Sequence, residues 1–97
     1  ELSMGVLINT GAIVEHDCFL SISSSLAPNS VLAGLVKLGS FTHIGLSSTV
    51  DAKVTLGSNC VLGANSFLME NLGDNSVAYG NPARFKRKRI DGENYLK

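Results

Sequence analysis

The adjacent residues Glu15 and His16 carry the clearest chemical signal in this sequence. A carboxylate beside an imidazole can fix the tautomer of the ring and raise its basicity, and such a histidine is suited to act as a general base. A surface histidine beside a surface glutamate has the same sequence, so the pair alone leaves both interpretations open. The element that carries the pair therefore has to be found first.

The other histidine and the two cysteines are expected to have structural roles and not catalytic ones. His43 directly precedes an aliphatic residue and is expected to point outward from a strand, at the surface or at a subunit interface. Two histidines cannot make a three-histidine zinc site, and no other cluster has ligand spacing, so we expect no metal. Cys18 and Cys60 are too few for a disulfide framework and are expected to be reduced, core-filling thiols.

A period of six residues organises the chain. Every sixth residue from Ile8 to Leu68 is aliphatic, and the residue two places before it is small or β-branched. Alternation within each hexad predicts a short strand, and the frequent Gly, Ala, Asn or acidic residue after the aliphatic one predicts a bend there. The repeat is typical of an all-β fold, a single-stranded left-handed parallel β-helix of about 3.5 to 4 coils.

The repeat also assigns neighbours in space. Three hexads make one triangular coil, so residues 18 apart stack along the axis at about 4.8 Å, the spacing of parallel strands. Gly34 is therefore expected directly above His16, with its backbone amide unshielded. A sandwich or barrel would need turns at spacings of about 8 to 12 residues, and the strict register of six disfavours it.

The repeat ends after Leu68, which divides the chain into two parts. Residues 1–72 are predicted to form the β-helix domain, and residues 73–97 a C-terminal loop, cap and basic tail. The basic run at residues 86–89 is either a solvated tail or a phosphate-binding one. It has no aromatic platform or reading helix around it, so we expect no nucleic-acid partner.

The chain has no apolar run long enough to cross a bilayer and no signal-peptide pattern at its start. We therefore expect no membrane partner and a cytoplasmic location. Because the sequence begins at Glu1 instead of Met, a further N-terminal domain is conceivable.

Four short stretches together resemble the hexapeptide-repeat acyltransferases, in particular the branch of sialic acid O-acetyltransferases and UDP-amino-sugar N-acetyltransferases. The resemblance extends from about residue 5 to residue 90, and the stretches are Ile8-Asn9-Thr10, Val14-Glu15-His16-Asp17-Cys18, Leu32-Ala33-Gly34 and Gly80-Asn81-Pro82-Ala83-Arg84. The resemblance implies a homotrimer that binds acetyl-CoA, as co-substrate, in the groove between neighbouring subunits. It also implies a small, sugar-like acceptor.

The resemblance assigns roles to individual residues. His16 matches the base that deprotonates the acceptor amine or hydroxyl, Glu15 matches the acid that orients it, and the Gly34 amide matches the donor to the oxyanion. Asn9 matches a residue near the acceptor. The residues that match the lining of the acetyl-CoA site are Gly34, Leu46, Gly63 and Ala64, with Arg84 for the phosphates.

At one position the chain departs from the family. Ser25 stands where relatives often have a second histidine, which implies the loss of an ancillary contact to the acetyl group. We predict an acetyl-CoA-dependent acetyltransferase acting on an amino or hydroxyl group. The alternatives are a catalytically silent trimeric module for binding or assembly and a relative of the γ-class carbonic anhydrases, which the missing third histidine disfavours.

Overall fold

The computed structural model describes residue 2 and residues 4–90 and contains strands, turns and bends over these residues. A two-residue strand recurs once per hexad, as predicted. The strands of the repeat are β1 (Leu7–Ile8), β2 (Ile13–Val14), β3 (Phe19–Leu20), β4 (Ser25–Leu26), β5 (Val31–Leu32), β6 (Lys37–Leu38), β7 (His43–Ile44), β8 (Thr49–Val50), β9 (Thr55–Leu56), β10 (Val61–Leu62) and β11 (Phe67–Leu68). Two longer strands follow them, β12 (Ser76–Gly80) and β13 (Ala83–Lys88).

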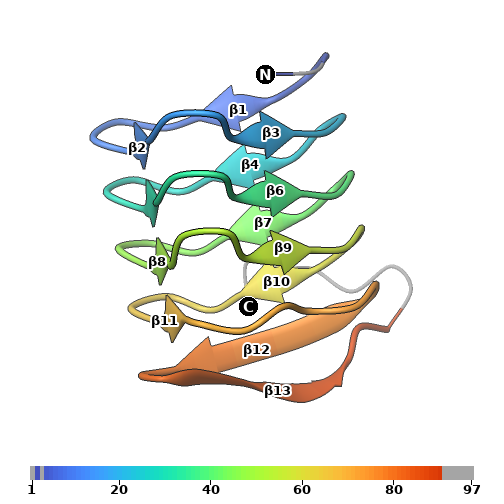
Figure 1. The fold of residues 1–97 in the computed structure, drawn as a ribbon. Coiled ribbons are helices and arrows are strands. Elements are labelled where there is room, and N and C mark those ends of the chain that lie inside the picture. The colour runs from blue at the N-terminus through green and yellow to red at the C-terminus, as the bar shows by residue number, and fades with distance from the viewer. Residues whose placement is uncertain (1, 3, 91–97) are drawn as a thin grey trace.

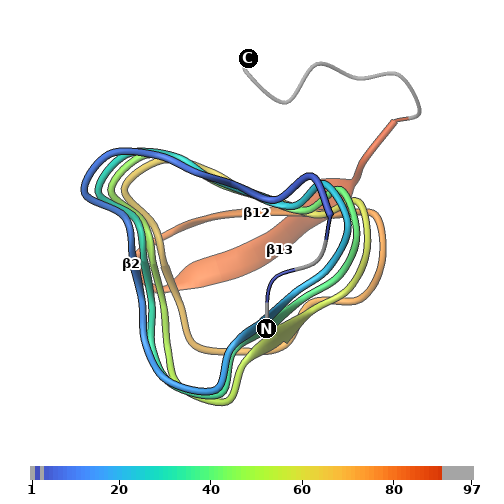
Figure 2. The ribbon, with the colours of Figure 1, turned by 90° about the horizontal axis from the view of Figure 1, so that it is seen from above.

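The strands stack into three sheets, one on each side of a triangular coil, and the strands of the repeat are parallel (Figures 1 and 2). Their orders are β1-β4-β7-β10-β12-β13, β2-β5-β8-β11 and β3-β6-β9. Within the repeat, paired residues are 18 apart, as in Leu26 with Ile44 and Leu32 with Val50. The structure is therefore a left-handed β-helix of about four turns, which confirms the predicted fold class.

The core is the stack of inward-facing aliphatic residues. From Leu20 to Leu68 each of them is at most 2% exposed. The small inner residues carry hydroxyl and thiol groups, which need hydrogen-bond partners when buried. Thr42 Oγ1 donates to the Gly57 carbonyl at 2.6 Å, and Cys18 Sγ to the Ala33 carbonyl at 3.2 Å. Both cysteines are buried free thiols, as predicted.

The bends lie two residues later than the sequence suggested. The residue with positive φ is the third after each aliphatic residue, and it recurs without interruption at Gly5, Gly11, Asp17, Ser23, Asn29, Leu35, Phe41, Ser47, Lys53, Asn59 and Asn65. The small residue directly after the aliphatic one has another purpose. A Cβ on Gly45 would lie 2.6 Å from the Leu62 carbonyl oxygen, so the close approach of consecutive coils requires its absence.

The last coil is two residues shorter than the others, which explains the apparent end of the repeat. Val61 pairs with Val77 and Leu56 bridges to Leu72, in each case 16 residues apart. Strand β12 thereby extends the first sheet, and β13 folds back on it as an antiparallel partner (Figure 1). Buried Ala78 closes this end of the core. The division at residue 72 stays a prediction, and part of the predicted tail, residues 91–97, lies outside the described residues.

The opposite end of the solenoid is less covered. Ile8 occupies an inner position but is 39% exposed, and Val6, Ala12 and Val14 are only partly buried. Within residues 2 and 4–90, no helix is long and apolar enough to cross a membrane.

Candidate functional site

His16 lies at the corner that follows β2, and its side chain is 73% exposed. Its Nδ1 atom is 3.4 Å from Oδ2 of Asp17, which adopts the left-handed conformation of the corner with φ of 58°. Glu15, the predicted partner, is also exposed, but the carboxylate that the structure sets beside the ring belongs to Asp17. A carboxylate at this place can accept a hydrogen bond from Nδ1 and so hold the orientation of the ring.

Gly34 lies against the His16 ring, one coil further along the axis. The Leu35 N–H donates to the His16 carbonyl at 3.1 Å and ties the two corners together. A Cβ on Gly34 would be 2.8 Å from Nε2 and 2.9 Å from Cε1 of His16. The imidazole can therefore hold this position only because residue 34 is a glycine.

The Gly34 amide is available as a donor. At the equivalent position one coil later, the Ala52 N–H donates to Oδ1 of Asp51 at 2.8 Å. Among the described residues, the Gly34 N–H has no such acceptor. A backbone donor next to an exposed imidazole can stabilise negative charge that develops on a carbonyl oxygen when a nucleophile attacks it.

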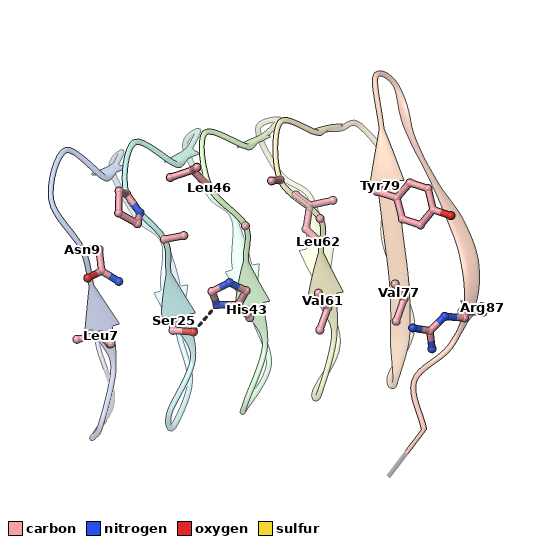
Figure 3. Close-up of a pocket in the computed structure, with 15 residues that line it drawn as sticks. Leu7, Asn9, Ser25, His43, Leu46, Val61, Leu62, Val77, Tyr79 and Arg87 are labelled. Carbon is pink, nitrogen blue, oxygen red and sulfur yellow. Dashed lines mark hydrogen bonds between the residues drawn. The ribbon is translucent and has the colours of Figure 1, made fainter. Parts of the chain in front are cut away.

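A groove of about 680 Å³ runs along the outer face of the first sheet and over the corner that follows it (Figure 3). It crosses every strand of that sheet, from β1 at one end to β13 at the other. The lining residues are Leu7, Asn9, Ser25, Ala27, Pro28, His43, Gly45, Leu46, Val61, Leu62, Gly63, Ala64, Val77, Tyr79 and Arg87. The groove thus has mostly apolar walls and a few polar side chains.

The groove gathers four of the residues predicted to bind ligands, Asn9, Leu46, Gly63 and Ala64. Asn9 Nδ2 donates to the Leu26 carbonyl at 3.0 Å, so this side chain is held against the groove wall. Packing also requires a glycine at position 63, because a Cβ there would lie 2.9 Å from Cβ of Tyr79. The missing side chain seats the tyrosine at the edge of the groove.

Arg84 is not among the lining residues, and its Nη1 donates to the Ala83 carbonyl at 3.2 Å. Arg87 lines the groove instead, because the antiparallel register sets it opposite Val77 on the outer face (Figure 3). A guanidinium at this end of the groove is suited to bind phosphate.

The predicted catalytic residues do not meet the groove within one chain. Glu15, His16 and Gly34 lie at the corner after the second sheet, and none of them lines the groove. The groove with Leu46, Gly63 and Ala64 is therefore separate from the corner that carries the predicted catalytic residues. Gly34 was predicted for both roles and lies at the corner.

Two polar residues in the middle of the groove were not predicted to belong to the site. Ser25 Oγ is 2.8 Å from Nδ1 of His43, across neighbouring strands β4 and β7 (Figure 3). Partial burial, together with the nearby Arg89 guanidinium, lowers the pKa of His43 below its usual value. The spacing of 18 residues had set both in one column, but only the structure shows the hydrogen bond.

Arg89 is held in place by hydrogen bonds to two asparagines near the C-terminal end of the solenoid. Its Nη1 donates to Oδ1 of Asn59 at 2.5 Å, and its backbone N–H donates to the Asn75 carbonyl at 2.6 Å. Among residues 2 and 4–90, the structure brings together no group of three His, Cys, Asp or Glu side chains that could hold a metal ion.

No family model matches the sequence, but individual proteins of known class are similar to it. An O-acyltransferase from Campylobacter concisus, named for acyl-acyl-carrier-protein and UDP-N-acetylglucosamine, is 30% identical over 87 residues, which cover 82% of this chain and 33% of the relative. A similar enzyme from Burkholderia orbicola is 32% identical over 79 residues, or 81% of this chain and 30% of the relative. The chain thus spans about a third of the length of the curated relatives it matches.

Solved structures match over a larger share of this chain. A variant of the GDP-perosamine N-acetyltransferase from Caulobacter crescentus, in complex with CoA and GDP-perosamine, superposes with a TM-score of 0.88 and 36% identity, over 90% of this chain and 41% of that one. The acetyltransferase domain of PglB from Neisseria gonorrhoeae, in complex with acetyl coenzyme A, gives a TM-score of 0.80 and 28% identity, over 88% and 44% of the two chains. The homologues and structural neighbours of this chain are therefore hexapeptide-repeat acyltransferases, as the sequence motifs predicted, and the chain has their left-handed β-helix.

Proposed function

We propose that this chain is the catalytic β-helix of an acetyl-CoA-dependent acetyltransferase that modifies an amino or hydroxyl group of a sugar. The observation that carries the proposal is the contact between Gly34 and His16. It joins a solvent-accessible base to a backbone donor on the next coil, which is the pair of groups that acyl transfer from a thioester requires.

In the proposed reaction the acceptor attacks the thioester directly. His16 takes a proton from the acceptor amine or hydroxyl as its nitrogen or oxygen forms a bond to the carbonyl carbon. The negative charge that develops on the carbonyl oxygen is stabilised by the Gly34 N–H. When the intermediate collapses, the carbon–sulfur bond breaks, and the imidazolium returns its proton to the departing thiolate to give CoA.

The carboxylates beside His16 stabilise the imidazolium between these two proton transfers. Asp17 lies 3.4 Å from Nδ1 in the structure, so it can accept a hydrogen bond from that atom when Nε2 faces the acceptor. Glu15 was the predicted partner and is a second carboxylate at the same corner. Asp17→Asn and Glu15→Gln, compared side by side, would identify which of the two supports the base.

The groove on the first sheet is the proposed binding site for acetyl-CoA. Its apolar walls, with Leu46 and Ala64, suit the pantetheine arm, and Arg87 at the β13 end suits the phosphates. Two of the structural neighbours were solved with CoA or acetyl coenzyme A, which supports a CoA thioester as the donor. GDP-perosamine in one of them supports an amino sugar carried on a nucleotide as the acceptor.

The separation of groove and corner supports a homotrimer. Because His16 does not line the groove of its own chain, a complete site would need the groove of one copy and the His16 corner of the next. Large apolar side chains on the outer surface could be covered by such an interface, among them Ile13, Phe19, Ile22 and Phe41, each between 47% and 60% exposed. Sedimentation equilibrium would measure the mass and test for three chains.

The activity is tested by thiol release from acetyl-CoA with a panel of nucleotide-linked amino sugars and sialic acids. We expect release with at least one acceptor and its loss in His16→Ala, with the folded structure kept because the side chain is exposed. Glu70→Ala is the matched control, since residue 70 is exposed in the same axial column as His16. Normal turnover by His16→Ala would refute the proposed role of this residue.

A further inference from the structure

The hydrogen-bonded pair Ser25 and His43 is the one polar feature midway along the wall of the groove. The residues on either side of it on the same outer face are Leu7 on β1 and Val61 on β10, both apolar (Figure 3). The pair is partly buried, and its two polar atoms are 2.8 Å apart. A neutral imidazole and a hydroxyl held in this way can present one hydrogen-bond donor to a ligand in the groove.

The groove has a basic end, which orients an acyl donor within it. Arg87 lies on β13, and Lys86 lies on the same strand, with Nζ 5.1 Å from the ring centroid of Tyr79. The Ser25 and His43 pair lies on β4 and β7, three to four strands away from β13. At about 4.8 Å per strand, this separation is about 14 to 19 Å.

That separation matches the length of a pantetheine arm. About thirteen bonds join its phosphorus to its sulfur, which corresponds to a little over four residues of extended backbone, or about 15 Å. With its phosphates at Arg87, an extended arm would therefore bring its thioester to the level of Ser25 and His43.

The electrostatics of the pair agree with this orientation. Partial burial and the nearby Arg89 keep the pKa of His43 low, so the ring is mostly neutral near pH 7. A neutral pair is suited to a carbonyl oxygen and poorly suited to phosphate, which the basic end binds better.

We propose that Ser25 donates a hydrogen bond to the carbonyl oxygen of the bound thioester, and that His43 positions Ser25 for this contact. We assign the Nδ1–H tautomer to His43, so that Nδ1 donates to Ser25 Oγ, 2.8 Å away, and the hydroxyl hydrogen is left for the ligand. This inference rests on the proposed function, because it assumes a CoA thioester in the groove. It also assigns a contact where the sequence implied that one had been lost.

The test compares the binding of acetyl-CoA with that of CoA, which lacks the carbonyl. Calorimetry should show that Ser25→Ala weakens acetyl-CoA about fivefold, the value of one modest hydrogen bond, and leaves CoA unchanged. Ser25→Thr keeps the hydroxyl and should restore the preference. His43→Phe, which leaves the hydroxyl without its partner, should reduce the preference for acetyl-CoA in the same direction.

The matched control is Thr55→Val, which removes a hydroxyl from the equivalent strand position of the third sheet, where Thr55 is exposed and outside the groove. It should bind both ligands as the original chain does. Equal weakening of both ligands by Ser25→Ala, or no weakening of either, would overturn this inference alone. Failure of the unaltered chain to bind acetyl-CoA and CoA would overturn the proposed function together with it.

Discussion

Replacing Gly34 by alanine tests the proposed chemistry of the His16 corner separately from the stability of the fold. The added Cβ would lie 2.8 Å from Nε2 and 2.9 Å from Cε1 of His16. Since such atoms are normally about 3.5 Å apart, the ring has to move by about 0.7 Å. A displacement of this size at the proposed base should reduce turnover by about ten- to a hundredfold.

The same substitution should cost little or no stability. The His16 side chain is 73% exposed and can move into solvent, and the backbone at Gly34 is outside the left-handed region. A glycine-to-alanine change at a permitted backbone conformation stabilises a protein by about 0.4 to 1 kcal/mol, because it restricts the unfolded chain. The melting temperature should therefore be unchanged or slightly higher while the activity falls.

The assay is thiol release from acetyl-CoA with a working acceptor, run beside thermal unfolding of the same preparation. Ala52→Gly is the control, because residue 52 is the next in the column of His16 and Gly34. It should lower the melting temperature slightly and leave turnover unchanged. An active Gly34→Ala enzyme would refute the reasoning, and so would an inactive one that had lost several degrees of melting temperature.

Two further predictions concern the scaffold. Lys53 lies at a corner with φ of 66°, a conformation that favours Asn or Gly over Lys. Lys53→Asn should therefore raise the free energy of unfolding, measured in urea, by about 0.5 to 1 kcal/mol. An unchanged or lower urea midpoint would contradict this. The pKa of His43 in the folded chain is lowered from 6.5, so the unfolded chain binds a proton at this residue more readily. The contribution of neutral His43 to the free energy of unfolding is therefore complete above pH 6.5 and should be lost as the pH falls through the folded pKa. Urea unfolding at pH 7.5 and 5.5 should show a smaller acid-induced loss in His43→Asn, and an identical loss in both proteins would contradict the assignment.

The fold could be predicted from the repeat because every hexad has the same pattern of inward-facing and outward-facing residues. Inner residues such as Leu32 and Val50 must be aliphatic to stack on one another, so their periodicity is visible in the sequence. The stacking of Gly34 on His16 follows from the same period, and the structure bears it out. The predicted bends were two residues too early. Small residues such as Gly45 are needed where consecutive coils approach closely, and in a sequence a small residue is also typical of a bend.

Several residues of the site could not be predicted, because their positions depend on parts of the chain that depart from the six-residue repeat. The last coil lacks two residues, so no fixed spacing could show that Tyr79 and Arg87 reach the groove. The choice between Arg84 and Arg87 follows from the antiparallel register of β12 and β13. The position of Asp17 beside His16 depends on the left-handed backbone of the corner.

Calorimetric titration of the chain with acetyl-CoA measures whether the groove on the first sheet binds the proposed acyl donor. We expect saturable binding with one acetyl-CoA per chain, three per trimer, and a rise in melting temperature at saturation. We also expect Arg87→Ala to weaken the binding more than Arg84→Ala, because Arg87 lines the groove and Arg84 does not. Absence of both heat and thermal shift at saturating acetyl-CoA would contradict the proposed function.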